Sequence, residues 1–266
     1  MIEVKGINQS YDKHGHKKTL DNINLTLKEN AVTALVGANG AGKSTLLGVI
    51  TGLIPSMSGD VFIGGVKMTH MKTKEVAKSI AVLRQTHNIS IRITVRDLIE
   101  FGRFPHCGGR LREEDHAKVD EAITYMNLGE LSGRFLDELS GGQKQRAFIA
   151  MILAQDTPYV FFDEPLNNLD IKYSVEMMKI ITKLADDLGK TVIVVLHDIN
   201  FASAYADHII AMKGGRIVNE GSPKKIITKS VLDGVFDHDF HIAEHDGKNI
   251  CLYYDNPAAI NAKNAG

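Results

Sequence analysis

Short apolar segments alternate along most of the chain with longer segments whose apolar residues stand three or four positions apart. The first pattern is typical of strands buried in a sheet, and the second of helices that pack one face on a core. Strands are predicted at residues 2–4, 25–27, 31–36, 60–63, 80–83, 159–162, 191–196, 209–212 and 216–220. Helices are predicted at residues 43–51, 95–101, 112–128, 142–155, 172–188 and 199–206. Such alternation indicates an α/β fold with a mostly parallel sheet.

One stretch, from about residue 86 to residue 137, departs from this alternation. It carries helical signals and few strand signals, including Thr94 as a helix cap and a long amphipathic segment at 112–128. We interpret it as a helical insertion within a single domain that spans residues 1–254. The last residues, 255–266, are rich in Asn and Ala and are expected to form a flexible tail.

Composition and charge narrow the class of protein. The chain has 266 residues, 44% of them hydrophobic, which suits one large domain with a buried core. Its net charge of -1 excludes a generally basic protein held to nucleic acid by charge alone. Cys107 and Cys251 form no Cys-x-x-Cys pair, so a disulfide framework and a cysteine zinc site are disfavoured, and a reducing cytosol fits.

No segment of the sequence reads as a membrane span or a signal peptide. Apolar runs such as residues 192–196 are far shorter than the roughly 18 residues that a bilayer requires. The first residues lack a basic start followed by an apolar stretch. We therefore expect a cytoplasmic chain that reaches a membrane only through a partner.

A glycine-rich loop follows the predicted strand at 31–36 and precedes the predicted helix at 43–51. It fits the pattern G-x-x-x-x-G-K-[ST] and consists of Gly37, Ala38, Asn39, Gly40, Ala41, Gly42, Lys43, Ser44 and Thr45. Glycines let backbone N–H groups approach a phosphate chain, and the helix start adds partial positive charge. Lys43 can bridge the β and γ phosphates, and Ser44 can ligate Mg²⁺. An ordinary glycine turn is the alternative, which the strand and helix context disfavours.

Two carboxylates close the apolar strand at 159–162. They are Asp163 and Glu164, and ligands of parallel sheets gather at the carboxyl ends of strands. Asp163 is expected to hold Mg²⁺, directly or through water. Glu164 is expected to orient and polarise the attacking water. Many strands end in acidic residues, so this interpretation depends on the phosphate loop.

A second glycine motif lies before the predicted helix at 142–155. It consists of Leu139, Ser140, Gly141, Gly142 and Gln143, and it has the features of a second anion site at a helix start. A chain with one phosphate loop has no evident need for another. We therefore expect this motif to meet the γ-phosphate bound on a second copy of the chain.

This order of motifs resembles the ATP-binding cassette (ABC) ATPases, over nearly the whole chain from about residue 2 to residue 254. The resemblance implies a P-loop NTPase core with a mixed, largely parallel sheet, an N-terminal antiparallel β subdomain and a helical insertion. It implies ATP and Mg²⁺ as cofactors. It also implies a homodimer in which each ATP lies between the phosphate loop of one copy and the Leu139–Gln143 motif of the other.

The resemblance assigns further residues to the site. Tyr11 matches the aromatic residue that stacks on adenine, although an isolated tyrosine more often has a packing role. Gln85 matches the glutamine that contacts Mg²⁺ and signals to the membrane subunit. His197 matches the histidine that contacts the γ-phosphate, so Glu164, His197 and Gln85 form the expected catalytic set.

A loop that crosses the dimer interface in this family matches the residues that follow the acidic strand end. These residues are Asn167, Asn168, Leu169 and Asp170. Many relatives carry a serine with a small residue or histidine where this chain has the two asparagines. That difference bears on the fine contacts of the interface rather than on the activity.

Three segments are similar to ATPases that serve iron-chelate importers, above all importers of ferric siderophores. They are residues 93–105, 197–200 and 235–254. The resemblance implies integral membrane permease subunits as partners, an indirect link to an extracytoplasmic substrate-binding protein, no nucleic acid, and a peripheral position on the cytoplasmic face of the membrane. Haem, vitamin B12 or a metal ion remains the alternative cargo.

Two other classes of function fit less well. Cassette proteins that act on ribosomes or DNA usually carry two cassettes or a long coiled-coil arm, and this chain shows neither. A small-molecule kinase would explain the phosphate loop but not the second glycine motif.

Several histidines near the C-terminus invite a metal-site interpretation. His238, His241 and His245 lie close to Asp237 and Asp239 in the sequence. Their spacing fits no well-supported zinc pattern, so we favour solvated loop histidines.

Overall fold

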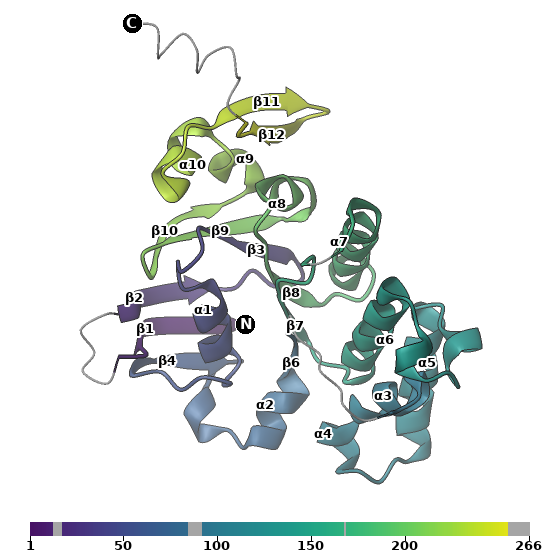
Figure 1. Cartoon of the computed structure of the whole chain (residues 1–266). Coiled ribbons are helices and arrows are strands. Elements are labelled where there is room, and N and C mark those ends of the chain that lie inside the picture. Colours follow the sequence, from purple (N-terminus) through teal and green to yellow (C-terminus); the bar gives the residue numbers. More distant parts are fainter. Residues whose placement is uncertain (13–17, 85–91, 168, 255–266) are drawn as a thin grey trace, which may run out of the picture.

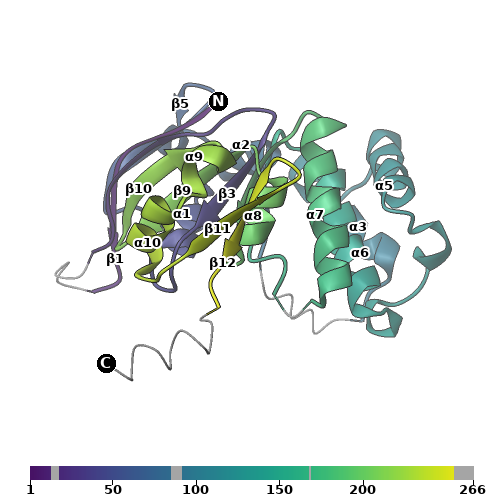
Figure 2. The same cartoon turned by 90° about the horizontal axis from the view of Figure 1, so that it is seen from above.

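The computed structural model describes residues 1–12, 18–84, 92–167 and 169–254, and it arranges them as sheets flanked by helices (Figures 1 and 2). The strands are β1 (Ile2–Ser10), β2 (Lys18–Thr26), β3 (Val32–Val36), β4 (Ser58–Ile63), β5 (Val66–Lys67), β6 (Ile80–Leu83), β7 (Tyr159–Asp163), β8 (Thr191–Val195), β9 (His208–Lys213), β10 (Arg216–Gly221), β11 (His241–His245) and β12 (Lys248–Leu252). The helices are α1 (Lys43–Ile50), α2 (Thr73–Ser79), α3 (Val95–Phe101), α4 (Phe104–Cys107), α5 (Glu113–Tyr125), α6 (Gly141–Ala154), α7 (Ile171–Asp186), α8 (Ile199–Tyr205), α9 (Pro223–Ile226) and α10 (Lys229–Phe236). Short 3₁₀ turns occupy Met68–His70, Gly129–Leu131 and Leu136–Glu138.

A mixed sheet forms the centre of the molecule. Within the described residues its strand order is β10-β9-β3-β8-β7-β6, and every neighbouring pair is parallel except β9 with β10. A separate antiparallel sheet has the order β2-β1-β4-β5. The predicted fold class, a largely parallel core sheet with an N-terminal antiparallel subdomain and added helices, is confirmed.

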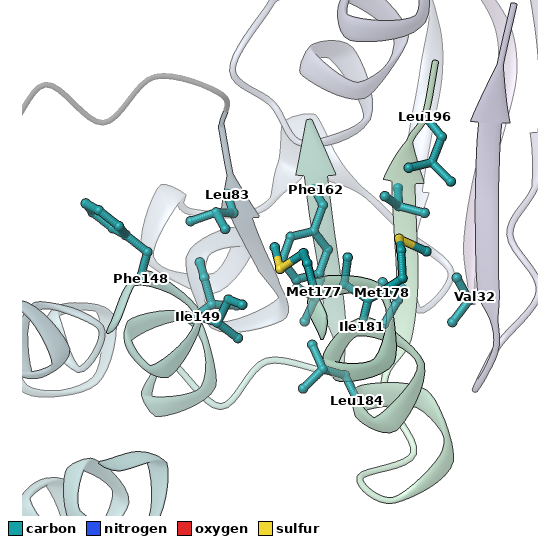
Figure 3. Close-up of a cluster of buried hydrophobic side chains, with 14 of the residues drawn as sticks. Val32, Leu83, Phe148, Ile149, Phe162, Met177, Met178, Ile181, Leu184 and Leu196 are labelled. Carbon is teal, nitrogen blue, oxygen red and sulfur yellow. The ribbon is translucent and has the colours of Figure 1, made fainter. Parts of the chain in front are cut away.

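The central strands are buried on both faces. Along β7, Phe162 packs with α6 and α7 on one side of the sheet, in the core shown in Figure 3. Phe161 packs on the other side with α1 and the antiparallel sheet. A strand covered on both faces reads as a continuous apolar run, which is why β7 was predictable from its sequence.

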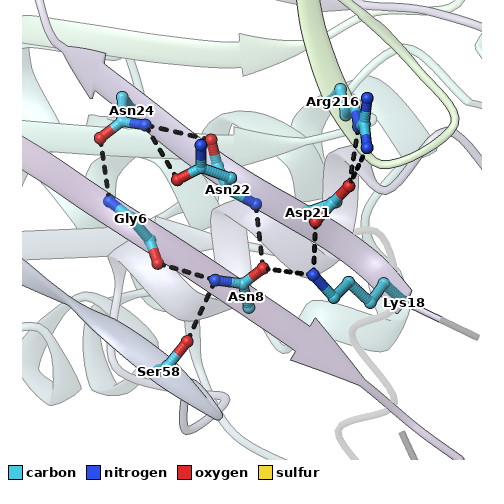
Figure 4. A network of polar contacts seen from close by, with 8 residues as sticks. All are labelled: Gly6, Asn8, Lys18, Asp21, Asn22, Asn24, Ser58 and Arg216. Atoms are coloured by element: carbon cyan, nitrogen blue, oxygen red, sulfur yellow. Dashed lines mark hydrogen bonds and ion pairs between the residues drawn. The ribbon is translucent and has the colours of Figure 1, made fainter. Parts of the chain in front are cut away.

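Polar contacts fasten the antiparallel sheet to the edge of the central sheet. Arg216 of β10 forms an ion pair with Asp21 of β2 (Figure 4). Within the antiparallel sheet itself, Lys18 Nζ donates to Asn8 Oδ1 at 3.1 Å. The backbone N–H of Asp21 donates to Gly215 O at 2.9 Å. The β9–β10 turn is therefore held against β2, close to the phosphate loop.

The helices α3 and α5 pack against α6, away from α1 and the antiparallel sheet (Figures 1 and 2). Thr94 caps α3 as expected, since its side chain accepts a hydrogen bond from Asp97 N at 3.1 Å. The predicted helix at 112–128 ends earlier, at Tyr125, because the chain turns at Asn127 with a φ of 51°. Asparagine tolerates this left-handed conformation better than most residues.

Several elements of the C-terminal region were missed. These are α9, α10 and the hairpin of β11 and β12, whose two-residue turn consists of Asp246 (φ 49°) and Gly247 (φ 73°). An Asp-Gly pair between short strands favours this type of turn, so the signal was present in the sequence. The short helix α2 was missed as well, because seven residues give too little periodicity.

We expected the C-terminal histidines to lie in a solvated loop. Two of the three lie in a strand instead. His241 and His245 lie in β11, whereas His238 Nε2 is 3.0 Å from Tyr253 O and its ring packs edge-on against Phe240. Among residues 1–12, 18–84, 92–167 and 169–254, no three His, Cys, Asp or Glu side chains lie close enough together to hold a metal ion. In the same ranges, no helix is long and apolar enough to cross a bilayer.

Candidate functional site

Three adjacent parallel strands deliver the expected site residues to one edge of the central sheet. The phosphate loop follows β3, His197 follows β8, and Asp163 closes β7. The strand order β3-β8-β7 makes these three ends neighbours although the residues are far apart in the sequence. The crevice outside the carboxyl ends of parallel strands is where such folds bind ligands.

The backbone of the phosphate loop needs glycine at defined positions. Gly37, Gly40 and Gly42 have φ values of 147°, 78° and 100°. A Cβ on Gly37 would lie 2.2 Å from Met212 O, and a Cβ on Gly42 would lie 2.7 Å from Thr19 O. The loop is thus packed on its inner side against neighbouring backbone, while Ala38 to Gly40 are exposed. Its outer side can present N–H groups to an anion.

Lys43 extends across this loop. Its Nζ donates to Gly37 O at 2.7 Å and to Ala38 O at 3.1 Å, and the residue is only 5% exposed. Burial lowers the pKa of Lys43, and the nearby carboxylates of Glu164 and Asp163 oppose that shift. A phosphate in the loop would compensate the buried ammonium more fully than carbonyl oxygens do.

Ser44 and Asp163 form a pair of oxygen donors beside the loop. Ser44 Oγ donates to Asp163 Oδ1 at 2.9 Å. Burial raises the pKa of Asp163, and the charge of Glu164 adds to the rise, whereas the bond from Ser44 and the charges of Arg84 and Lys43 lower it. A hydroxyl and a carboxylate at this spacing fit a hard cation such as Mg²⁺, whose charge would favour the ionised form of Asp163.

The buried carboxylate of Asp163 gives a prediction about stability. Because its pKa is raised on folding, the folded chain binds a proton there more tightly than the unfolded chain does. The free energy of unfolding therefore falls as the pH rises from the ordinary pKa of 3.8 through the folded value. The substitution Asp163→Asn removes this pH-dependent loss of stability, and the amide oxygen of the new asparagine can still accept a hydrogen bond from Ser44. We expect thermal unfolding near neutral pH to show a gain of about 1 kcal/mol, or a few degrees in Tm.

The gain should shrink as the pH is lowered, because the wild-type carboxyl then becomes neutral. An Asp163→Asn variant whose Tm advantage is constant from acid to neutral pH would show that ionisation of Asp163 is not the cause. Asp60→Asn, at a half-buried ion pair with Lys67, is the matched control.

Glu164 sits in a turn that presents its carboxylate to two other side chains. Its φ is 53°, in the left-handed region, and its side chain is 17% exposed. His197 Nε2 lies 2.8 Å from Glu164 Oε1, and Asn167 Nδ2 donates to Glu164 Oε2 at 2.6 Å. Each oxygen of this carboxylate therefore has one polar partner in the structure.

Tyr11 lies at the margin of the phosphate loop. Its hydroxyl is 3.3 Å from Thr45 Oγ1, and the residue is 65% exposed. An exposed aromatic ring beside a phosphate site can pack on a flat heterocycle at small entropic cost. The structure thus brings the predicted adenine-stacking residue to the predicted loop.

The second glycine motif starts α6, on the other side of the central sheet from α1 (Figures 1 and 2). Ser140 Oγ accepts from Gln143 N at 3.4 Å, and Gln143 Oε1 accepts from Ser140 N at 3.0 Å. Ser140 and Gly141 are exposed, and a Cβ on Gly142 would lie 2.8 Å from the Tyr173 ring. Within the described residues, Leu139–Gln143 form no hydrogen bond or ion pair with the phosphate loop. Ser140 and Gly141, at the start of α6, therefore face solvent in the single chain.

The loop expected at a dimer interface is described in part. Asp170 caps α7 by accepting from Tyr173 N at 3.0 Å, and Leu169 packs against the core. Asn167 turns inward to Glu164. Asn168 lies outside the described residues, as does Gln85, which stands two residues after the last residue of β6.

Sequence reasoning missed two residues of this region. Arg84, the residue that follows β6, is close enough for its charge to lower the pKa of Asp163. Gln145 Nε2 donates to Pro165 O at 2.8 Å and so connects α6 to the turn of Glu164. Neither has a local pattern that marks it, because both contacts depend on how β6, β7 and α6 pack together.

The fold and the site together define a P-loop nucleotide-binding protein. Comparison with known sequences is more specific, because the profile of the ABC transporter family matches residues 20–167. The chain belongs to the ABC transporter family, as one of its ATP-binding ATPase subunits.

Two curated relatives cover most of this chain. The petrobactin import ATP-binding protein YclP of Bacillus subtilis (strain 168) is 47% identical over 254 residues, which are 96% of this chain and 100% of that protein. The ferric enterobactin transport ATP-binding protein FepC of Escherichia coli (strain K12) is 37% identical over 84% of this chain and 83% of its own length.

Solved structures agree with the fold. The cbiO1 protein of Clostridium perfringens, part of the ABC transporter complex cbiONQ, has a TM-score of 0.77 and 29% identity, over 87% of this chain and 92% of its own. The dimeric structure of the ATP-binding cassette MJ0796 bound to ADP and Pi has a TM-score of 0.72 and 31% identity, over 84% and 98% of the two chains.

Proposed function

We propose that this chain is the ATPase subunit of an importer of ferric siderophores. The observation that carries the cargo assignment is the similarity to the petrobactin import protein YclP over 96% of the chain. Relatives named for other ferric siderophores, such as enterobactin, support the same class of cargo. The cargo itself would pass through membrane subunits, so no pocket of this chain is expected to bind it.

The working unit of the proposal is a homodimer with shared nucleotide sites. The exposed start of α6 at Ser140 and Gly141 is an anion site that lies on the opposite side of the sheet from α1. In a two-fold dimer, this surface of one copy can cover the phosphate loop of the other, which gives two equivalent sites. The dimeric form of the cassette MJ0796 supports this arrangement.

Within each site the residues of this chain have distinct tasks. The loop N–H groups and Lys43 bind the phosphates, and Tyr11 packs on the base. Ser44 and Asp163 would hold Mg²⁺, which would supply neutralising charge to the phosphates. Glu164 holds the attacking water and accepts its proton, while His197 contacts the γ-phosphate. Closure with ATP and reopening after hydrolysis would drive the membrane subunits.

A membrane permease would need a docking surface on this chain. Phe101, at the end of α3, is 58% exposed and Phe104, at the start of α4, is 60% exposed. Two large apolar side chains so close together favour contact with a partner over contact with water. We propose that the permease contacts the α3–α4 corner and so holds the chain at the cytoplasmic face of the membrane.

The cargo is tested by uptake in cells that lack this protein. We expect loss of radiolabelled ferric-siderophore uptake, restored by the wild-type chain and not by Glu164→Gln expressed at the same level. Unchanged siderophore uptake together with lost uptake of haem, vitamin B12 or a metal ion would overturn the cargo assignment and leave the ATPase role intact.

A further inference from the structure

The turn between β7 and α7 holds the proposed general base from two sides. Glu164 Oε1 lies 2.8 Å from His197 Nε2, and Glu164 Oε2 accepts from Asn167 Nδ2 at 2.6 Å. The first contact comes from the next strand of the sheet, whereas the second comes from the same turn. A carboxylate with one partner on each oxygen cannot rotate about its last torsion without losing one of them.

The turn that carries Asn167 is itself fixed. Asn167 N donates to Glu164 O at 3.3 Å, which closes the turn. Gln145 Nε2 donates to Pro165 O at 2.8 Å and fastens the turn to α6. The helix α6 starts at the second glycine motif, so the amide of Asn167 is anchored to the element that would contact the other copy of the chain.

The charges around Glu164 would move its carboxylate if it had a single partner. The ammonium of Lys43 attracts the Glu164 carboxylate, whose charge raises the pKa of Lys43 against the lowering caused by burial. The carboxylate of Asp163 repels it, and the charge of Glu164 raises the pKa of Asp163. A fixed neutral donor on Oε2 resists this displacement without neutralising the base.

We propose that Asn167 is a positioning residue for ATP hydrolysis, which orients Glu164 through its side-chain amide. This inference rests on the proposed role of Glu164 and deepens it. A serine at this position would have a shorter side chain and no amide donor for Glu164 Oε2. Because a general base displaced by about 1 Å can cost up to about 100-fold in rate, losing the amide should lower kcat.

The test compares variants of the full-length chain. Asn167→Leu has a similar volume and no donor, and Asn167→Asp has the same shape but places a second carboxylate at Oε2. We expect Asn167→Leu to lower kcat about 10-fold, and Asn167→Asp by more, with the KM for ATP within about two-fold of wild type. Asn167→Gln keeps an amide donor and should recover most of the lost kcat.

Two controls separate positioning from a structural role. Asn219→Asp adds the same charge on β10, with β9, β3 and β8 between it and β7, and should leave kcat unchanged. In the Glu164→Gln background, single-turnover rates should not fall further when Asn167→Leu is added, since there is no base left to orient.

A kcat within two-fold of wild type in both Asn167→Leu and Asn167→Asp would overturn the proposal. So would an equal loss in the Glu164→Gln background, or a kcat loss in Asn167→Gln as large as in Asn167→Leu. If Asn167→Leu lowers Tm markedly, the kcat of the isosteric variant Asn167→Asp tests the proposal instead. Normal turnover by Glu164→Gln itself would instead remove the proposed role of Glu164.

Discussion

Replacing Glu164 with glutamine is expected to lower kcat by about 10²–10⁴-fold while the affinity for ATP stays at its wild-type value. The amide keeps the shape of the side chain, and it can still accept from Asn167 Nδ2 and face His197 Nε2. It cannot take a proton from water. Steady-state hydrolysis measured beside equilibrium ATP binding separates these two effects.

The matched control for this prediction is Glu130→Gln, an exposed glutamate in the turn after α5, which should hydrolyse ATP normally. If Glu164→Gln turned ATP over at a rate close to that of the wild type, another group would have to serve as the base. Such a result would leave the phosphate loop and the fold assignment untouched.

Replacing Lys43 with alanine is expected to weaken ATP binding by about 10-fold to 100-fold. The ammonium lies over the loop, 2.7 Å from Gly37 O, and charge-assisted hydrogen bonds to phosphate contribute about 1.5–3 kcal/mol each. The folded chain should not lose stability in proportion, because burial already disfavours the charged form, as the lowered pKa of Lys43 shows. Titration calorimetry with ATP gives the affinity, and thermal unfolding gives the stability.

Lys5→Ala, at an exposed position of β1, is the control and should bind ATP normally. Equal ATP affinities for Lys43→Ala and Lys5→Ala would mean that the phosphates are bound elsewhere on the chain.

The parts of the site that the sequence could predict are those defined by local patterns. The phosphate loop needs only a buried strand, closely placed glycines and a helix start, and all of these lie within residues 31–51. The strand β7 is a continuous apolar run, and Thr94 and Ser140 are recognisable caps of α3 and α6. Such signals come from residues that are close together in the sequence, so they can be recognised without knowledge of the packing.

The remaining contacts of the site depend on topology. Ser44, which follows β3, meets Asp163 at the end of β7 although β8 lies between these two strands, and no short pattern encodes that strand order. Asn167 meets Glu164 because the chain turns at a φ of 53° after β7. Both asparagine and glutamate are common in exposed loops, so their pairing needed the structure.

The C-terminal region shows a different limit. Its helix α10 and the hairpin of β11 and β12 are short, and their burial comes from partners elsewhere in the fold. Asn200 of α8, for example, donates to Cys251 O at 3.2 Å and accepts from Cys251 N at 2.8 Å. Where tertiary partners supply most of the stability, intrinsic patterns in the sequence are weak.

The most direct test of the shared nucleotide site is the hydrolysis rate per chain measured over a dilution series with saturating ATP and Mg²⁺. If a second copy must complete each site, the rate per chain should fall at least about 10-fold as the protein is diluted below its dimerisation range. Ser140→Arg, which crowds the exposed start of α6, should bind ATP normally and stay slow at every concentration. A wild-type rate per chain that stays constant down to the lowest concentration, with Ser140→Arg equally active, would contradict the account.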